Sequence, residues 1–252
     1  MSASARPFRE RKQRLAKIRW PLVIRRTHKW IALFVGIQVV LWTLTGFYMV
    51  VVHIDTIHGD HLVRAPAAQP YELTTLAPPS AIVAAAPGAT EVRLQRLFDQ
   101  PVWRVEKANG ALLLYDGRTG KRLPPPTEAD IRALARRIYT GSGNIVSARL
   151  LIEAPLEMQS RKPPYWQVEF EGWNRPTLYL SPATGELISR RHNLWRIFDF
   201  AWMLHIMDYQ GRTDVNNPLL RVATWSAFAM AFSGAWLLLW SFPKRKKKRA
   251  AA

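Results

Sequence analysis

The chain has 252 residues, a formal net charge of +18 and no cysteine. The charge gathers at the two ends: residues 1–30 hold ten Lys and Arg against one acid, and residues 244–249 hold six more. Because the middle is nearly neutral, we interpret the charge as membrane topology and attraction to anionic lipid headgroups, with no role in binding nucleic acid. Without cysteine, no disulfide supports the fold.

Two apolar runs, Trp30–Val52 and Val222–Phe242, are long enough to cross a hydrocarbon layer of about 30 Å as helices. The first run is too long for the core of a signal peptide, so we expect it to stay as an anchor. The basic ends predict cytoplasmic termini and an outer middle segment. The expected parts are a basic tail 1–29, a transmembrane helix 30–52, an extracytoplasmic (periplasmic) domain 53–193, an interfacial apolar helix 194–209, a second transmembrane helix 218–242 and a second basic tail 243–252.

The outer segment contains an internal repeat, about 71–123 and 127–188, in which each copy predicts one helix and three strands before a Thr-Gly turn. Pro101–Glu106 is similar to Pro164–Glu169, which predicts equivalent core positions for Trp103 and Trp166. The expected fold class is α+β. The expected helices are Leu73–Ala86 and Thr127–Tyr139, the latter with Thr127 as its N-cap, and the expected strands are Glu91–Phe98, Val102–Lys107, Ala111–Tyr115, Asn144–Ile152, Tyr165–Phe170 and Thr177–Leu180.

The turns Asp116–Gly120 and Ser181–Gly185 resemble those that close PepSY domains. The flanking segments Arg25–Trp30, Trp42–Gly46 and Trp202–Tyr209 resemble PepSY-associated transmembrane proteins. The resemblance implies two transmembrane helices that flank two PepSY-like units, each a helix with an antiparallel sheet. Some proteins of this family are haem-containing reductases of ferric siderophores, and relatives are joined to flavin- and iron–sulfur-bearing reductases. The resemblance therefore implies that the protein binds haem b, takes part in transmembrane electron transfer and receives electrons from a flavin- or iron–sulfur-bearing reductase.

All six histidines fall near the expected membrane boundaries. His28 and His53, at opposite mouths of the first span, are about 37 Å apart along a helix, so one chain cannot use both for one haem. His205 lies on the interfacial apolar helix, where we expect it close to His53 and supported by Asp208. His205 and His53 are therefore candidate axial ligands of one haem iron, while His28 is a candidate at a second site. Such a second site needs a homodimer or a partner membrane subunit. In the alternative interpretation, His53 only caps a helix and His205 hydrogen-bonds to Asp208 or to a backbone carbonyl.

Other residues near the boundaries allow two interpretations each. By composition, the histidines at 53, 58 and 61 with Asp55 and Asp60 resemble a Zn or Cu site, but the spacing also fits a solvated turn closed by Gly59. Four tryptophans either line the haem site or anchor the helices at the interface: Trp30, Trp42, Trp195 and Trp202. Small residues allow close helix approach: Gly36, Thr45, Gly46, Ser233 and Gly234.

The sequence contains no Walker loop, nucleophile elbow, dinucleotide fingerprint or HExxH motif, so we do not expect an autonomous hydrolase or NAD enzyme. The leading hypothesis is an inner-membrane component of a haem-dependent reductase that passes electrons to ferric iron or a ferric siderophore. The alternative is a non-catalytic, membrane-tethered PepSY interaction module, or an accessory subunit of a larger membrane complex.

Overall fold

The computed structural model describes residues 20–64, 70–97 and 99–241, so most of both expected basic tails lies outside the described residues. The chain divides into two compact units. The first joins Met1–Leu41 to Pro218–Ala252, and the second is Trp42–Asn217.

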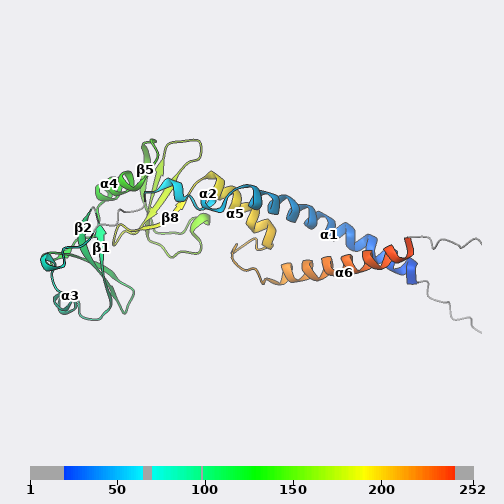
Figure 1. Cartoon of the computed structure of the whole chain (residues 1–252), viewed down its shortest axis with the longest axis horizontal. Helices are drawn as coiled ribbons and strands as arrows, with labels where there is room; N and C mark the ends of the chain where they lie inside the picture. Colours follow the sequence, from blue (N-terminus) through cyan, green and yellow to red (C-terminus); the bar gives the residue numbers. More distant parts are fainter. Residues whose placement is uncertain (1–19, 65–69, 98, 242–252) are drawn as a thin grey trace, which may run out of the picture. The chain divides into compact units, whose positions relative to one another are not determined.

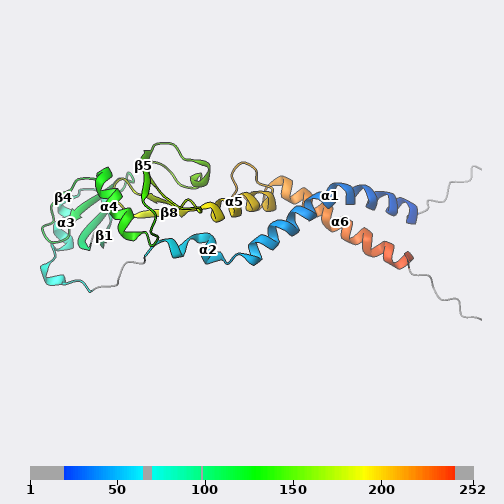
Figure 2. The ribbon, with the colours of Figure 1, turned by 90° about the horizontal axis from the view of Figure 1, so that it is seen from above.

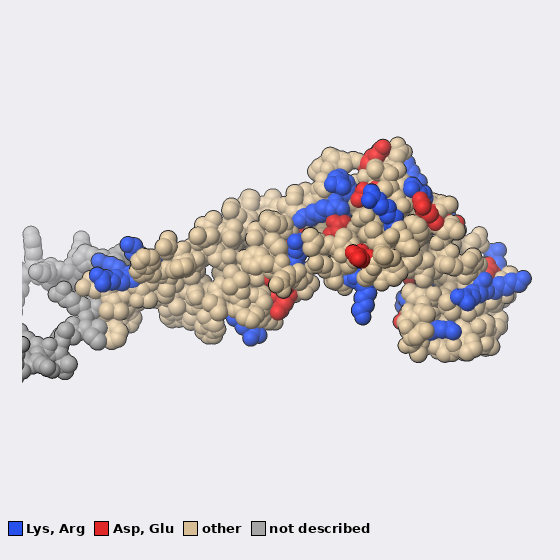
Figure 3. All heavy atoms as spheres, turned by 180° about the vertical axis from the view of Figure 1, so that it is seen from behind, with Lys and Arg blue, Asp and Glu red and all other residues tan. Residues whose placement is uncertain are grey.

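The first unit consists of the N-terminal part of α1 (Trp20–Val51) and all of α6 (Pro218–Ser241). Both helices are long and apolar enough to cross a membrane, over Leu22–Val51 and Pro218–Leu239. Figure 3 shows few charged side chains along these helices on the face in view. α6 begins at Pro218, as predicted, because a proline at the first helical position has no N–H that would need a partner.

The second unit carries two four-stranded antiparallel sheets (Figure 1). The first has the order β1 (Ala89–Leu97), β2 (Gln100–Lys107), β3 (Leu112–Asp116) and β4 (Arg122–Leu123), and α3 (Pro79–Ala85) packs beside β1. Its core includes Ile82, Val105 and Tyr115. The long helix expected at Leu73–Ala86 is divided into a 3₁₀ turn, Leu73–Thr75, and α3, since Pro78 and Pro79 permit a helix to begin but not to pass through them.

The second sheet has the order β5 (Ile145–Leu151), β6 (Tyr165–Phe170), β7 (Thr177–Leu180) and β8 (Leu187–Arg191). α4 (Glu128–Ile138) lies against β5 and β6 (Figure 2). The predicted N-cap is confirmed: the Thr127 side chain accepts from the backbone N–H of Asp130, whose carboxylate accepts from the N–H of Thr127. Residues of α4 and of the strands share one core, which includes Ile131, Val168 and Leu178.

The three strands predicted before each Thr-Gly turn are present, but the count of three strands for each copy was wrong, because each sheet has a fourth strand after that turn. Gly120 and Gly185 have φ of 68° and 71°, a left-handed conformation that favours glycine, and the reversed chain then pairs with the preceding strand. Trp103 and Trp166 occupy matching places in β2 and β6, as predicted. Trp103 is buried, whereas Trp166 is only half-buried against its core.

Two shorter helices connect the long helices to the sheets along the chain. α2 (Ile54–His58) follows α1 and leads into a 3₁₀ turn, Asp60–Leu62. α5 (Asn193–Ile206) follows β8 and ends at Met207, whose φ of 56° stops the helix. The apolar helix expected at 194–209 is therefore present and ends three residues earlier.

Candidate functional site: two histidines, each with a hydroxyl and a glycine

His205, near the end of α5, lies against the C-terminal part of α1. Its ring Nδ1 is 2.9 Å from the hydroxyl of Thr45, which is buried. Its backbone carbonyl accepts a hydrogen bond of 2.7 Å from the indole Nε1 of Trp42. Gly46 follows Thr45, and a Cβ placed on it would lie 3.8 Å from the His205 Cε1. One turn of α1 thus holds both the ring and the backbone of His205.

His28, in the first unit, has a set of the same kind on α6. Its Nδ1 is 2.7 Å from the Ser233 hydroxyl, and a Cβ placed on Gly234 would lie 3.2 Å from its Cε1. In each set, therefore, a hydroxyl residue meets Nδ1 and the glycine after it faces the Cε1 edge of the ring. The dipeptides Thr45-Gly46 and Ser233-Gly234 stand in matching roles on different helices.

Each hydroxyl also has a backbone carbonyl within hydrogen-bond distance, which bears on the tautomer of the histidine. Thr45 donates to the carbonyl of Trp42 at 3.3 Å, and Ser233 donates to the carbonyl of Met230 at 2.9 Å. A hydroxyl has a single proton, so an oxygen that donates to a carbonyl can only accept from a histidine nitrogen. When a hydroxyl donates to its carbonyl, the Nδ1 beside it carries the proton and Nε2 carries the lone pair. This is the tautomer in which a histidine binds a metal through Nε2 while Nδ1–H is held by a neighbour.

Within the described residues, neither Nε2 takes part in a hydrogen bond. The His205 ring stacks with Trp202, with 6.4 Å between centroids and 12° between planes, and Trp202 stacks in turn with Phe198. Both histidines are half-buried, and in that tautomer each has an Nε2 that carries the lone pair. The arrangement can donate one nitrogen ligand to a metal centre at each set.

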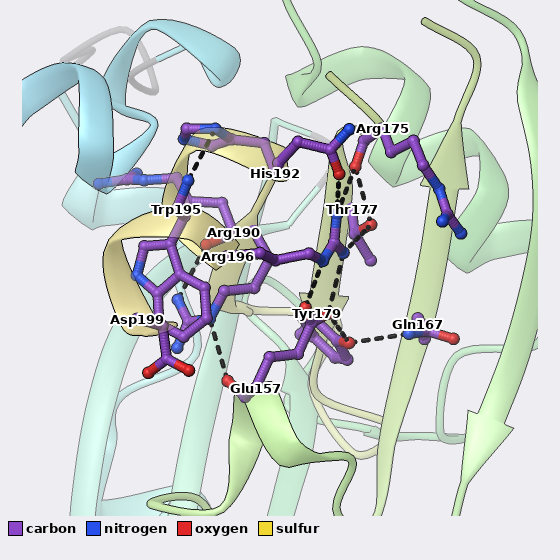
Figure 4. A network of polar contacts seen from close by, with 12 residues as sticks. Glu157, Gln167, Arg175, Thr177, Tyr179, Arg190, His192, Trp195, Arg196 and Asp199 are labelled. Carbon is purple, nitrogen blue, oxygen red and sulfur yellow. Dashed lines mark hydrogen bonds and ion pairs between the residues drawn. The ribbon is translucent and has the colours of Figure 1, made fainter. Parts of the chain in front are cut away.

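A polar network anchors α5 to the second sheet and so fixes where His205 lies (Figure 4). Arg196 of α5 donates through Nε and Nη2 to the Glu157 carboxylate, at 2.6 and 3.1 Å, and through Nη2 to the Thr177 hydroxyl at 3.1 Å. Glu157 also accepts from the hydroxyl of Tyr179 at 2.5 Å. Burial and the Glu157 carboxylate raise the pKa of Tyr179, so this hydroxyl remains a donor. On the other side, Tyr48 of α1 donates to the carbonyl of Leu194 at 2.9 Å.

His53 lies elsewhere, as the N-cap of α2. Its Nδ1 accepts from the N–H of Asp55 and is 3.4 Å from the Asp55 carboxylate, and its side chain is 74% exposed. The hydroxyl that contacts His205 belongs to Thr45. Thr45 precedes His53 by eight residues, which corresponds to about 12 Å along a helix. The structure therefore brings Thr45 to His205, and a haem shared by His205 and His53 stays a prediction.

Asp208 does not contact the His205 ring through any hydrogen bond of the described residues. Its carboxylate accepts from the backbone N–H groups of residues 210, 211, 213 and 214 and closes the turn after α5. These bonds, chiefly that from Asp214, lower the pKa of Asp208 to about 2. In the described part of the chain, no three His, Cys, Asp or Glu residues gather as a metal site, the His53–His61 segment included.

The sequence did not single out Thr45, Gly46, Ser233 and Gly234 as partners of histidines, although it marked them as small residues. One sequence pattern could have indicated these contacts: a hydroxyl residue followed by glycine occurs once in each apolar span. His192 was also missed. It is fully buried, with Nε2 3.1 Å from the carbonyl of Ile57 and Nδ1 accepting from the N–H of Trp195, so it joins α2 to α5.

One comparison with known proteins identifies the chain. The comparison with curated proteins gave no match, and the comparison with solved structures gave none either. The family model described as the PepSY-associated TM region matches residues 25–252, which include most of α1, all of α6, both sheets and both histidine sets. The chain therefore belongs to the PepSY-associated transmembrane family.

Proposed function

We propose that this PepSY-family membrane protein binds haem b and carries electrons across a bacterial inner membrane. His205 and His28 are the iron ligands, one at each histidine set. The observation that carries the proposal is that both rings are fixed through Nδ1 by a hydroxyl and have Nε2 free of any hydrogen bond within the described residues.

The residues present fit a haem. Neutral histidine is a common axial ligand of haem iron, and it needs a partner at its second nitrogen to hold the ring in place. Thr45 and Ser233 supply this partner. Gly46 and Gly234 keep the edge of each ring free of side-chain bulk. When bound, the haem iron would supply one-electron transfer between its ferrous and ferric states.

In our proposal, a second copy of the chain would supply the second histidine for each iron. Within the described residues, each set contains only one histidine, and His53 is exposed and caps α2. Two copies would bring two His205 and two His28, enough for two irons with two histidines each. This is the homodimer expected from the need of the His28 site for a second histidine, and a partner membrane subunit with its own histidines is the alternative.

The proposed topology places both termini in the cytoplasm and the two sheets, each in a PepSY-like unit, in the periplasm. Support comes from the basic residues at the chain ends and from the two membrane-length helices. Electrons would then enter from a cytoplasmic donor of the flavin or iron–sulfur class and leave to ferric iron or a ferric siderophore outside. Reporter fusions at Asp116 and Ala252 test this: activity of a periplasmic reporter at Ala252 contradicts it.

The site is tested by replacing single histidines in the purified full-length protein. We expect His205→Ala and His28→Ala each to remove one b-type component from the visible spectrum, since each removes the nitrogen that binds iron at one set. His58→Ala is the matched control, because this exposed histidine belongs to neither set. Equal spectra in all three variants and the wild type would contradict the ligand assignment. If His53→Ala also loses a b-type component of the visible spectrum, the second histidine of that iron is His53 of the same chain.

A further inference from the structure

A cavity of about 360 Å³ lies where β8, α2 and the first turn of α5 meet. His58, Ser189, Arg190, Arg191 and Trp195 are among its lining residues, and no Asp or Glu lines it. A second cavity, of about 190 Å³, shares Arg191 and Trp195 with the first. The volume of the larger cavity falls in the range of about 300–1,000 Å³ typical of small-molecule sites.

Of the charged residues that line these two cavities, Arg191 is the one without an ion-pair partner among the described residues. Arg190 is paired with Asp60, and the acids of the smaller cavity, Glu157 and Asp199, are paired with Arg196 and Arg212. Among the described residues, no carboxylate forms an ion pair with Arg191. The cavity therefore has one cation in excess.

Arg191 is nevertheless held rigidly. Its Nε donates to the Glu157 carbonyl at 3.0 Å, its Nη1 donates to the Arg190 carbonyl at 2.9 Å, and its guanidinium lies 3.8 Å above the Trp195 ring. These partners are neutral. Burial lowers the pKa of Arg191, with the Glu157 carboxylate acting against it. A partly desolvated cation with no paired anion favours an anionic ligand, and the planar guanidinium suits carboxylate or phosphate oxygens.

We propose that this cavity is a binding site for a small oxyanion, a molecule with carboxylate or phosphate groups, held by Arg191. Arg190, whose charge is paired with Asp60, and His58 lie at the same cavity and offer N–H groups for a second oxygen. The cavity volume admits a ligand larger than a single phosphate ion. The ligand is either a free metabolite or the headgroup of a phospholipid, since both offer the same oxygens.

The site has a consequence for electron transfer, which rests on the proposed function. Trp195, Phe198 and Trp202 line the smaller cavity, and Trp202 stacks with His205 on the same helix. Three aromatic residues of α5, Trp195, Phe198 and Trp202, thus form a row in the chain between Arg191, which lies above the Trp195 ring, and His205. If His205 holds a haem, an oxyanion-bearing acceptor at Arg191 lies at the other end of this row.

The test is a binding titration by calorimetry on the purified full-length chain, with citrate and inorganic phosphate as separate probes. We expect Arg191→Gln to weaken binding by about tenfold or more, because a charge-assisted hydrogen bond is lost. Arg191→Lys keeps the charge without the planar fork and should fall between. Arg149→Gln is the matched control, since it removes the same charge from an exposed arginine of β5 that is not at the cavity. Unchanged melting temperatures verify that the variants fold.

Repeating the titration in nanodiscs of phosphatidylcholine or phosphatidylglycerol distinguishes the two sources. If phosphatidylglycerol weakens the binding of citrate or phosphate to the wild type but not to Arg191→Gln, the site binds a lipid headgroup. If citrate binds equally in both lipids, the site binds a free ligand. The proposal is overturned if the wild type binds neither probe nor lipid. It is also overturned if Arg191→Gln and Arg149→Gln bind alike. Because calorimetry needs no redox reaction, a failure of the haem proposal would leave this result intact.

Discussion

The network around Glu157 leads to a sharp prediction about how α5 is held. We consider Glu157→Gln, which keeps the shape of the side chain and removes its charge. In the wild type this carboxylate accepts two hydrogen bonds from Arg196 and one from Tyr179, and its side chain is 14% exposed. The variant leaves the Arg196 guanidinium without a counter-charge. It also places the amide N–H₂ of the new glutamine against a group that donates hydrogen bonds, either Arg196 or Tyr179.

The expected cost follows from these contacts. Removing one partner of a buried ion pair costs about 3–5 kcal/mol, and Arg196, at 30% exposed, recovers part of this from water. We therefore expect a loss of about 2–3 kcal/mol, which corresponds to a fall of about 4–12 °C in melting temperature for a domain of this size. Arg196 also bonds to Thr177, so the loss should be greatest where α5 meets β7.

The assay is thermal unfolding of the full-length protein in detergent, with Glu153→Gln as control. Glu153 is a nearby exposed acid without an ion pair in the described structure, so its replacement should change stability by less than about 0.5 kcal/mol. A double-mutant cycle with Arg196→Gln should give a coupling of about 1–3 kcal/mol. Equal melting temperatures of Glu157→Gln and Glu153→Gln would refute the reasoning.

Three further predictions concern single hydrogen-bonded groups. Burial lowers the pKa of His192 in the folded protein, so the unfolded chain binds a proton at this residue first as the pH falls below about 6.5. The melting temperature of the wild type should therefore fall between about pH 8 and pH 5, and that of His192→Gln should fall less. Thr45→Val removes the hydrogen-bond partner of the His205 Nδ1, so the ratio of haem to protein should fall, whereas Thr45→Ser should preserve it. The lowered pKa of Asp208 means that its turn keeps its stabilisation above about pH 4 and loses it as the pH falls through about 2. Asp208→Asn should therefore speed amide exchange in residues 210–214 at neutral pH, while an unchanged rate would contradict this role.

Much of the fold was predictable because it depends on local patterns. The bounds of β6 and β7, the N-cap at Thr127 and the start of α6 at Pro218 follow from alternation, a capping residue and a proline. The fourth strand of each sheet was not predicted, because β4 has only two residues and β8 has an Arg-rich end that shows no alternation. Both strands form because the preceding turn returns them to a partner, which is a tertiary effect.

The candidate site was predictable only in part. His205 and His28 stood out as polar rings next to apolar helices, and the structure gives both a hydroxyl partner. The expected approach of His53 to His205 depended on the depth at which α5 meets α1. That depth is set by Trp42, Thr45 and Tyr48, which contact α5 through the hydrogen bonds described above. No local pattern in either helix encodes this register.

The most direct test of the central proposal is a reduced-minus-oxidised visible spectrum of the purified wild-type protein, with haem and protein measured together. We predict the spectrum of a six-coordinate b-type haem and about one haem per chain, as two copies with two histidines at each iron require. A well-folded protein with no haem absorption would contradict the account and would favour a non-catalytic, membrane-tethered interaction module.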